Sequence, residues 1–113
     1  PVLSMKKGVT HEGSKRNLLG ENPDSKLVSE MSLETQVDDK TPPTFIFHTY
    51  EDQAVPAENA LLFVSSLRKF KVPCEFHLFH KGGHGVGLGR EGNKKWPILL
   101  NDWLTRSGYS LKL

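Results

Sequence analysis

An acidic residue and a histidine follow two short apolar runs in the second half of the chain. Asp52 comes after the run at 44–48, and His84 comes after the run at 74–80. If both runs are parallel strands of one sheet, the reactive groups collect beyond their carboxyl ends. A carboxylate there can orient an imidazole, which takes a proton from a serine. This order fits a serine-dependent reaction, with Asp52 as a candidate acid and His84 as a candidate base.

Both residues also have ordinary structural interpretations. Asp is common at turns and at helix starts, and a histidine in a glycine-rich loop can be a surface residue. The neighbouring carboxylate of Glu51 is a second candidate for the acid. At the level of residue types alone, these alternatives stay open.

The other histidines do not predict a metal site, and no cofactor is expected. On a strand, residues three apart point to opposite faces, so His77 and His80 are badly placed to share one ion with His84. His11 and its neighbour lack the second histidine of a zinc-binding H-E-x-x-H helix and are expected in solvated loop. His48 is expected to be a satisfied structural residue at a strand end.

The apolar pattern predicts a strand, a helix and a second strand in direct succession. Residues 44–48 form a near-continuous aromatic and β-branched run, which suits a strand covered on both faces. A helix is expected between the prolines at 56 and 73, and residues 74–80 alternate as a strand does. The apolar stripe of the helix is Ala60, Phe63, Val64, Leu67 and Phe70. Such tight connections predict parallel strands with a right-handed crossover.

A glycine-dense loop and a final helix complete the chain. Six of the ten glycines lie between Gly82 and Gly92, where they let the backbone turn sharply around His84. They do not spell the G-x-G-x-x-G of a dinucleotide site. The helix is expected to have Asn93 as a cap, Pro97 in its first turn and Gly108 past its end. Its apolar face comprises Trp96, Leu99, Leu100, Trp103 and Leu104, and both tryptophans are expected in the core.

Residues 1–42 are polar and poorly periodic. The apolar start at 1–5 suggests the end of a strand. Short helices are suggested by Leu18-Leu19 and by Leu27-Val28, the second with a start at 22–25. Residues 37–42 are interpreted as surface connection.

The expected fold class is therefore α/β, with parallel strands. Two strands and two helices do not make a complete parallel sheet, because such sheets need both faces covered and two edges would remain unpaired. The pattern suggests the end of a larger open sheet. A free apolar strand edge also predicts self-association, or pairing with a missing part of the same fold.

Three segments carry a resemblance to a known family. Residues 52–59, DQAVPAEN, are similar to that family's acid loop, D-x-x-V-P-x-E-N. Residues 82–85 are similar to its histidine loop. Trp96-Pro97 and Trp103-Leu104 are similar to its closing helix. The chain resembles bacterial α/β-hydrolases of the acetylxylan and feruloyl esterase-like family, some labelled endo-1,4-beta-xylanase B. The resemblance spans almost the whole chain. It implies an acylated carbohydrate such as xylan as the ester substrate, Asp52 as the triad acid and His84 as the triad base. Glu51 falls outside the family's spacing.

The chain departs from that family in lacking a nucleophile. None of its serines lies in G-x-S-x-G, and the oxyanion loop is also absent. Residues 1–113 are therefore interpreted as the C-terminal fragment of one α/β-hydrolase domain. In this interpretation 1–42 is a loop and short-helix segment, and 43–113 holds the last strands, the acid loop, the histidine loop and the final helix. Such a fragment is expected to be inactive alone.

Composition narrows the remaining classes of partner. The net charge of +2 is small and unclustered, so no nucleic-acid partner is expected. No apolar run approaches the roughly 20 residues of a membrane span, so no membrane partner is expected. A single Cys excludes an internal disulfide.

Two further functions compete with the esterase hypothesis. One is a non-catalytic interaction module that has lost the nucleophile. The other is a glycoside hydrolase that degrades xylan, which would need two facing carboxylates rather than the sequence neighbours Glu51 and Asp52.

Overall fold

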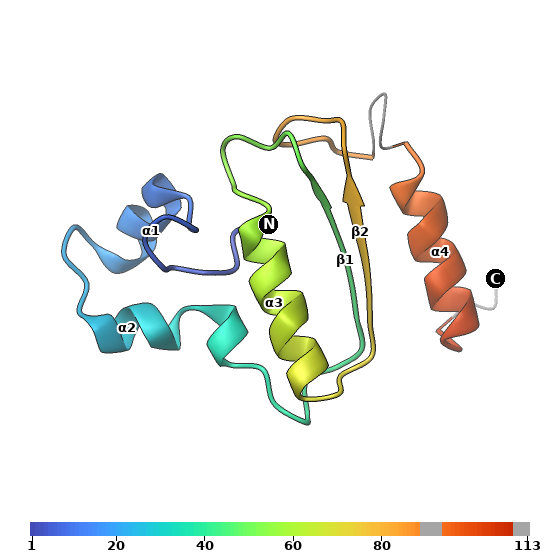
Figure 1. The fold of residues 1–113 in the computed structure, drawn as a ribbon, viewed down its shortest axis with the longest axis horizontal. Coiled ribbons are helices and arrows are strands. Elements are labelled where there is room, and N and C mark those ends of the chain that lie inside the picture. The colour runs from blue at the N-terminus through green and yellow to red at the C-terminus, as the bar shows by residue number, and fades with distance from the viewer. Residues whose placement is uncertain (89–93, 110–113) are drawn as a thin grey trace.

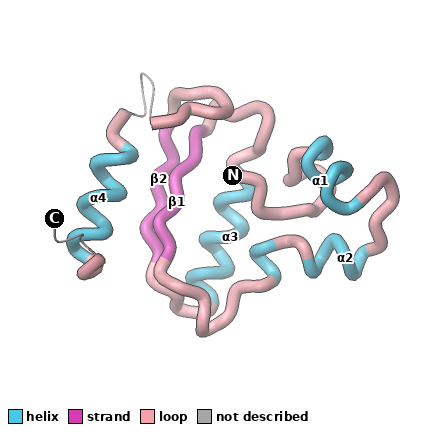
Figure 2. Tube along the Cα trace, turned by 180° about the vertical axis from the view of Figure 1, so that it is seen from behind, coloured by secondary structure: helices cyan, strands magenta, loops and turns pink. Residues whose placement is uncertain are grey.

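The computed structural model describes residues 1–88 and 94–109. Its elements in chain order are α1 (Glu12–Leu19), α2 (Ser25–Glu30), the 3₁₀ turn η1 (Leu33–Thr35), β1 (Thr44–Thr49), α3 (Glu58–Lys69), β2 (Cys74–Phe79) and α4 (Trp96–Arg106). In Figure 1 the two strands stand between α3 on one side and α4 on the other, with the N-terminal helices beyond α3. Figure 2 shows the same layers from behind.

The two strands pair in parallel, as the sequence predicts. The register runs from Thr44 opposite Cys74 to Thr49 opposite Phe79. Helix α3 connects the strands, so the predicted strand–helix–strand unit is confirmed. Because both carboxyl ends lie at one edge, the loops that follow β1 and β2 are brought together there.

Helix α4 covers one face of the sheet through its two tryptophans. The Trp96 ring stacks on Phe47 at 4.5 Å between centroids, and Trp103 lies 5.8 Å from Phe45. Both tryptophans are only half-buried, so the prediction that they belong to the core is wrong in degree. The reason is that α4 packs on the sheet with no further layer outside it among the described residues.

The apolar core lies between α3 and the segment before β1. Leu67 is fully buried and packs with Val37 and Val72. The interpretation of residues 37–42 as surface connection is therefore wrong for Val37. Phe70, which the stripe predicted on the buried face, is exposed because it caps the C-terminal end of α3 beyond the last helical turn.

The N-terminal segment differs from two predictions. Residues 1–5 form no strand, because side chains take up their peptide N–H groups. Asn59 Oδ1 accepts from the N–H groups of Leu3 and Ser4, both at 3.0 Å. His11, expected in solvated loop, instead caps α1 by accepting the Ser14 N–H at 3.2 Å.

The predicted short helices and the final helix are confirmed. Asp24 caps α2 by accepting the Leu27 N–H at 2.8 Å. Pro97 lies in the first turn of α4, and Gly108 follows the helix with φ +79°. The expected cap Asn93 lies outside the described residues, as do Gly89 and Gly92. No helix in 1–88 or 94–109 is long and apolar enough to cross a membrane.

Candidate active site

The loop after β1 folds around the carboxylate of Asp52. Its Oδ1 atom accepts two backbone N–H groups, from Ala54 at 3.0 Å and from Val55 at 2.9 Å. These bonds close a tight turn ahead of α3 and use one oxygen of the carboxylate. The second oxygen, Oδ2, is left to face the neighbouring loop.

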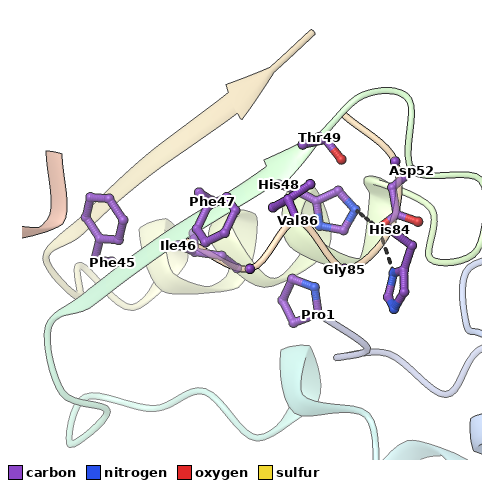
Figure 3. A pocket seen from close by; sticks show the side chains of 12 residues that line it. Pro1, Phe45, Ile46, Phe47, His48, Thr49, Asp52, His84, Gly85 and Val86 are labelled. Atoms are coloured by element: carbon purple, nitrogen blue, oxygen red, sulfur yellow. Dashed lines mark hydrogen bonds and ion pairs between the residues drawn. The ribbon is translucent and has the colours of Figure 1, made fainter. Parts of the chain in front are cut away.

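The loop after β2 brings His84 to that second oxygen. The Nδ1 atom of His84 lies 3.0 Å from Asp52 Oδ2, although the two residues are 32 positions apart (Figure 3). Gly85, directly after the histidine, has φ +73°, a conformation that favours glycine and turns the chain. The Asp52 side chain is 7% exposed and that of His84 is 57% exposed. The acid is thus sheltered, and the imidazole stands at the surface.

The electrostatics keep Asp52 ionised. Burial alone would raise the pKa of Asp52, but hydrogen bonds from the Val55 N–H and from His84 outweigh it and hold the pKa below its usual value. An ionised carboxylate is an acceptor only, so the Nδ1 atom of His84 carries the hydrogen. In the neutral ring Nε2 then has a free lone pair, and the ring can act as a base there.

The neighbouring carboxylate of Glu51 is engaged elsewhere. Its Oε1 atom accepts from Lys81 Nζ at 2.7 Å, and Oε2 accepts the Gly82 N–H at 3.2 Å. The hydrogen bond from Lys81 is the largest cause that lowers the pKa of Glu51. Asp52, rather than Glu51, therefore contacts the imidazole. Glu51 instead links the loop after β1 to the start of the loop after β2.

His48, at the end of β1, also reaches this site. It is 3% exposed, and its Nε2 atom lies 2.9 Å from the Val55 carbonyl and 3.7 Å from Asp52 Oδ2. Burial lowers the pKa of His48. Its Nδ1 atom is buried with no hydrogen-bond partner in the part of the chain that is described, so the expected satisfied structural histidine is only half satisfied. Alternation along β1 places His48 on the face of Ile46, but it does not indicate the contact with Asp52.

An open cavity of about 420 Å³ adjoins these residues. It runs along β1 from Phe45 to Thr49, and Asp52 and His84 stand at one end of it. Residues 83–87 of the histidine loop and Pro1 complete the wall. A reacting group that enters the cavity would meet the imidazole there.

The other histidines lie apart from this pair. His77 pairs with Glu75 at 2.9 Å, and the His80 ring contacts Tyr50 edge-on at 6.2 Å between centroids. Within the described ranges, no three His, Cys, Asp or Glu side chains gather as metal ligands.

Comparison with known proteins finds the same fold and related sequences. The model of the prolyl oligopeptidase family matches residues 4–108. An acetylxylan esterase from Xylanibacter ruminicola is 33% identical over 110 residues, which cover 92% of this chain and 23% of that protein. A protein named endo-1,4-beta-xylanase B from Butyrivibrio fibrisolvens is 45% identical over 82 residues, which cover 73% of this chain and 13% of that protein.

A solved structure extends the similarity to three dimensions. An acetyl ester-xyloside bifunctional hydrolase from Caldicellulosiruptor lactoaceticus matches with a TM-score of 0.91 and 47% identity, over 96% of this chain and 40% of that one. The chain thus spans less than half the length of each of these three proteins. The fold is a portion of the α/β-hydrolase fold, with its parallel strands and closing helix.

Proposed function

The chain belongs to the prolyl oligopeptidase family, and on that premise we propose that it carries the acid and the base of a serine-dependent carboxylic-ester hydrolase. The observation that supports this most directly is the 3.0 Å contact between Asp52 Oδ2 and His84 Nδ1. A sheltered, ionised carboxylate behind an exposed imidazole is the arrangement that nucleophilic catalysis by serine requires.

In this proposal His84 moves the protons. Its Nε2 atom takes the hydroxyl proton of the serine while the serine oxygen bonds to the ester carbonyl carbon. The protonated ring then gives that proton to the departing alcohol, which leaves an acyl-enzyme. Water attacks the acyl group in the reverse sequence, with His84 first as base and then as acid. Asp52 stabilises the ring in each protonated state and keeps Nε2 facing the reaction.

The nucleophile belongs to a longer protein in this proposal. No G-x-S-x-G is present in residues 1–113, and the chain spans 40% of the similar bifunctional hydrolase. Residues 1–113 would be the C-terminal portion of one domain, whose remainder supplies the serine and the oxyanion donors. The chain alone would be inactive, because these groups supply most of the rate.

The missing part of the domain has an obvious place beside β1. In the described residues, β1 pairs with β2 on one edge only, and the cavity lies along β1. A further parallel strand there would satisfy the free backbone groups of β1. It would also bring a serine at its carboxyl end toward His84.

The proposed substrate is an acylated plant polysaccharide such as xylan. This choice rests on the names of the similar proteins, an acetylxylan esterase and an acetyl ester-xyloside hydrolase. A glycoside hydrolase built on Glu51 and Asp52 is not favoured, because Glu51 binds Lys81 and Gly82 while Asp52 binds His84. Two facing carboxylates around a sugar are therefore not available from this pair.

The test is turnover of an acetyl ester and of acetylated xylan by the full-length protein. We expect His84→Ala to abolish hydrolysis of both. His77→Ala is the matched control, since His77 also bonds a carboxylate but lies away from the cavity, and it should keep the parent activity. Full activity of His84→Ala would refute the proposal, and an inactive parent protein would favour the non-catalytic interaction module.

A further inference from the structure

We propose that His48 is a positioning residue that holds Asp52 toward His84. This inference rests on the proposed ester hydrolysis, because it assigns His48 a role in that same site. It differs from the triad itself, since His48 is buried and acts on the reaction only through Asp52.

The contacts of the Val55 peptide carry the argument. Its N–H donates to Asp52 Oδ1 at 2.9 Å, and its carbonyl accepts from His48 Nε2 at 2.9 Å. The peptide is therefore held from both sides, and the Val55 side chain is itself 1% exposed. Because Oδ1 is fixed by this peptide, the direction of Oδ2 toward His84 depends on where His48 keeps Val55.

The protonation state of His48 follows from the same contacts. A carbonyl oxygen only accepts, so Nε2 of His48 carries the hydrogen. Its Nδ1 atom has no partner within the described chain and is buried. Protonation would put both a charge and an unpaired N–H in that place, and burial accordingly lowers the pKa of His48. His48 is thus a neutral donor of one fixed tautomer.

A neutral His48 also leaves the Asp52 carboxylate available to bond His84. His48 Nε2 lies 3.7 Å from Asp52 Oδ2, the same oxygen that His84 bonds at 3.0 Å. A second cation at that distance would compete with protonated His84 for the carboxylate. The neutral ring instead packs beside Oδ2 (Figure 3) and donates its hydrogen to the Val55 carbonyl.

The experiment compares two substitutions of His48 in the full-length hydrolase. His48→Leu removes the donor at similar volume, whereas His48→Gln keeps an N–H group at the position of Nε2. We expect His48→Leu to lower kcat for an acetyl ester by about 10²-fold, the cost of a small misplacement of a catalytic group, with KM nearly unchanged. His48→Gln should recover most of that loss. His77→Leu, the same replacement on the neighbouring strand, should keep kcat.

A spectroscopic measurement separates positioning from a merely structural role. The His84 Nδ1–H bonded to Asp52 should give a low-field proton signal in the parent protein and in His48→Gln, and this signal should be lost in His48→Leu. In the unmodified protein, nitrogen chemical shifts of His48 should report the neutral Nε2–H tautomer. This last measurement needs no variant, so it stays decisive even if His48→Leu does not fold.

The outcomes distinguish this inference from the proposed function. If His84→Ala abolishes turnover but His48→Leu folds and keeps kcat, the positioning role is wrong and the esterase stands. A cationic ring or an Nδ1–H tautomer of His48 would also overturn it, as would equal losses in His48→Leu and His48→Gln. If His84→Ala is itself active, the proposed function fails.

Discussion

The substitution Asp52→Asn tests the proposed acid most sharply, because the hydrogen bonds of the loop dictate how the new amide must sit. Asp52 Oδ1 accepts from both Ala54 and Val55. The amide has a single acceptor oxygen, and at the position of Oδ1 that oxygen keeps both N–H groups paired, of which the part-buried N–H of Val55 is costly to leave unpaired. The amide oxygen is therefore expected at the position of Oδ1, with the NH₂ group facing His84.

An NH₂ group there reverses the hydrogen bond with the imidazole. His84 Nδ1 must then accept, so its hydrogen moves to Nε2 and the ring loses the lone pair that takes the serine proton. In a serine protease the same change costs about 10⁴ in turnover, or about 5.5 kcal/mol. We expect a loss of that order in the full-length protein. The backbone should stay intact, because the bonds at Oδ1 are kept.

The assay is kcat for an acetyl ester, with circular dichroism and a thermal melt as folding controls. Glu51→Gln is the matched variant, since it alters the adjacent carboxylate but leaves the Asp52–His84 contact in place. We expect it to lose far less turnover than Asp52→Asn. Near-parent activity of Asp52→Asn together with a damaged Glu51→Gln would refute the assignment of the acid. An unfolded Asp52→Asn would refute the orientation argument.

Three further results are expected. Asn59→Leu removes the side-chain partner of three backbone groups, the N–H groups of Leu3 and Ser4 and the carbonyl of Val9, and should cost about 3 kcal/mol in denaturant unfolding of the intact protein; exposed Asn101→Leu should cost little, and equal costs would contradict the argument. The pKa of His48 is lower in the folded protein than its ordinary value of 6.5. The stability that neutral His48 contributes is therefore fully present above pH 6.5 and is lost as the pH falls toward the lower folded pKa. His48→Gln should remove this part of the pH dependence of stability. The outer edge of β1, which pairs with no strand among the described residues, should make the isolated chain self-associate or bind its missing partner segment, whereas a cooperatively folded monomer in ultracentrifugation would contradict that expectation.

The elements around the site could be predicted from the sequence because their patterns are local. The aromatic run at 44–48 and the alternation after residue 73 indicate strands within a few residues of the observed bounds. Helix α3 between them requires a parallel pair, so the carboxyl ends had to meet at one edge. Asp52 and His84 follow those ends directly, which is why they could be singled out as candidates without coordinates.

Contacts between distant segments decided the rest. Glu51 and Asp52 are neighbours in the chain, and only the docking of the loop after β2 gives Gly82 to one and His84 to the other. Val37 has the sequence context of a loop residue, yet it lies in the core because α3 packs over it. The wrong predictions of burial have the same cause. Periodicity describes one element at a time, whereas the burial of a side chain depends on what packs against that element.

His48 shows most clearly which properties the sequence determines and which the tertiary structure decides. Its place at the end of an apolar run that suits a strand covered on both faces indicates a structural residue. Its contacts with Val55 and Asp52 arise because the next seven residues fold back over the end of β1. That return is held by the hydrogen bonds of the Asp52 carboxylate and by the packing of α3, so hydrogen-bond geometry in the folded chain decided what this histidine does.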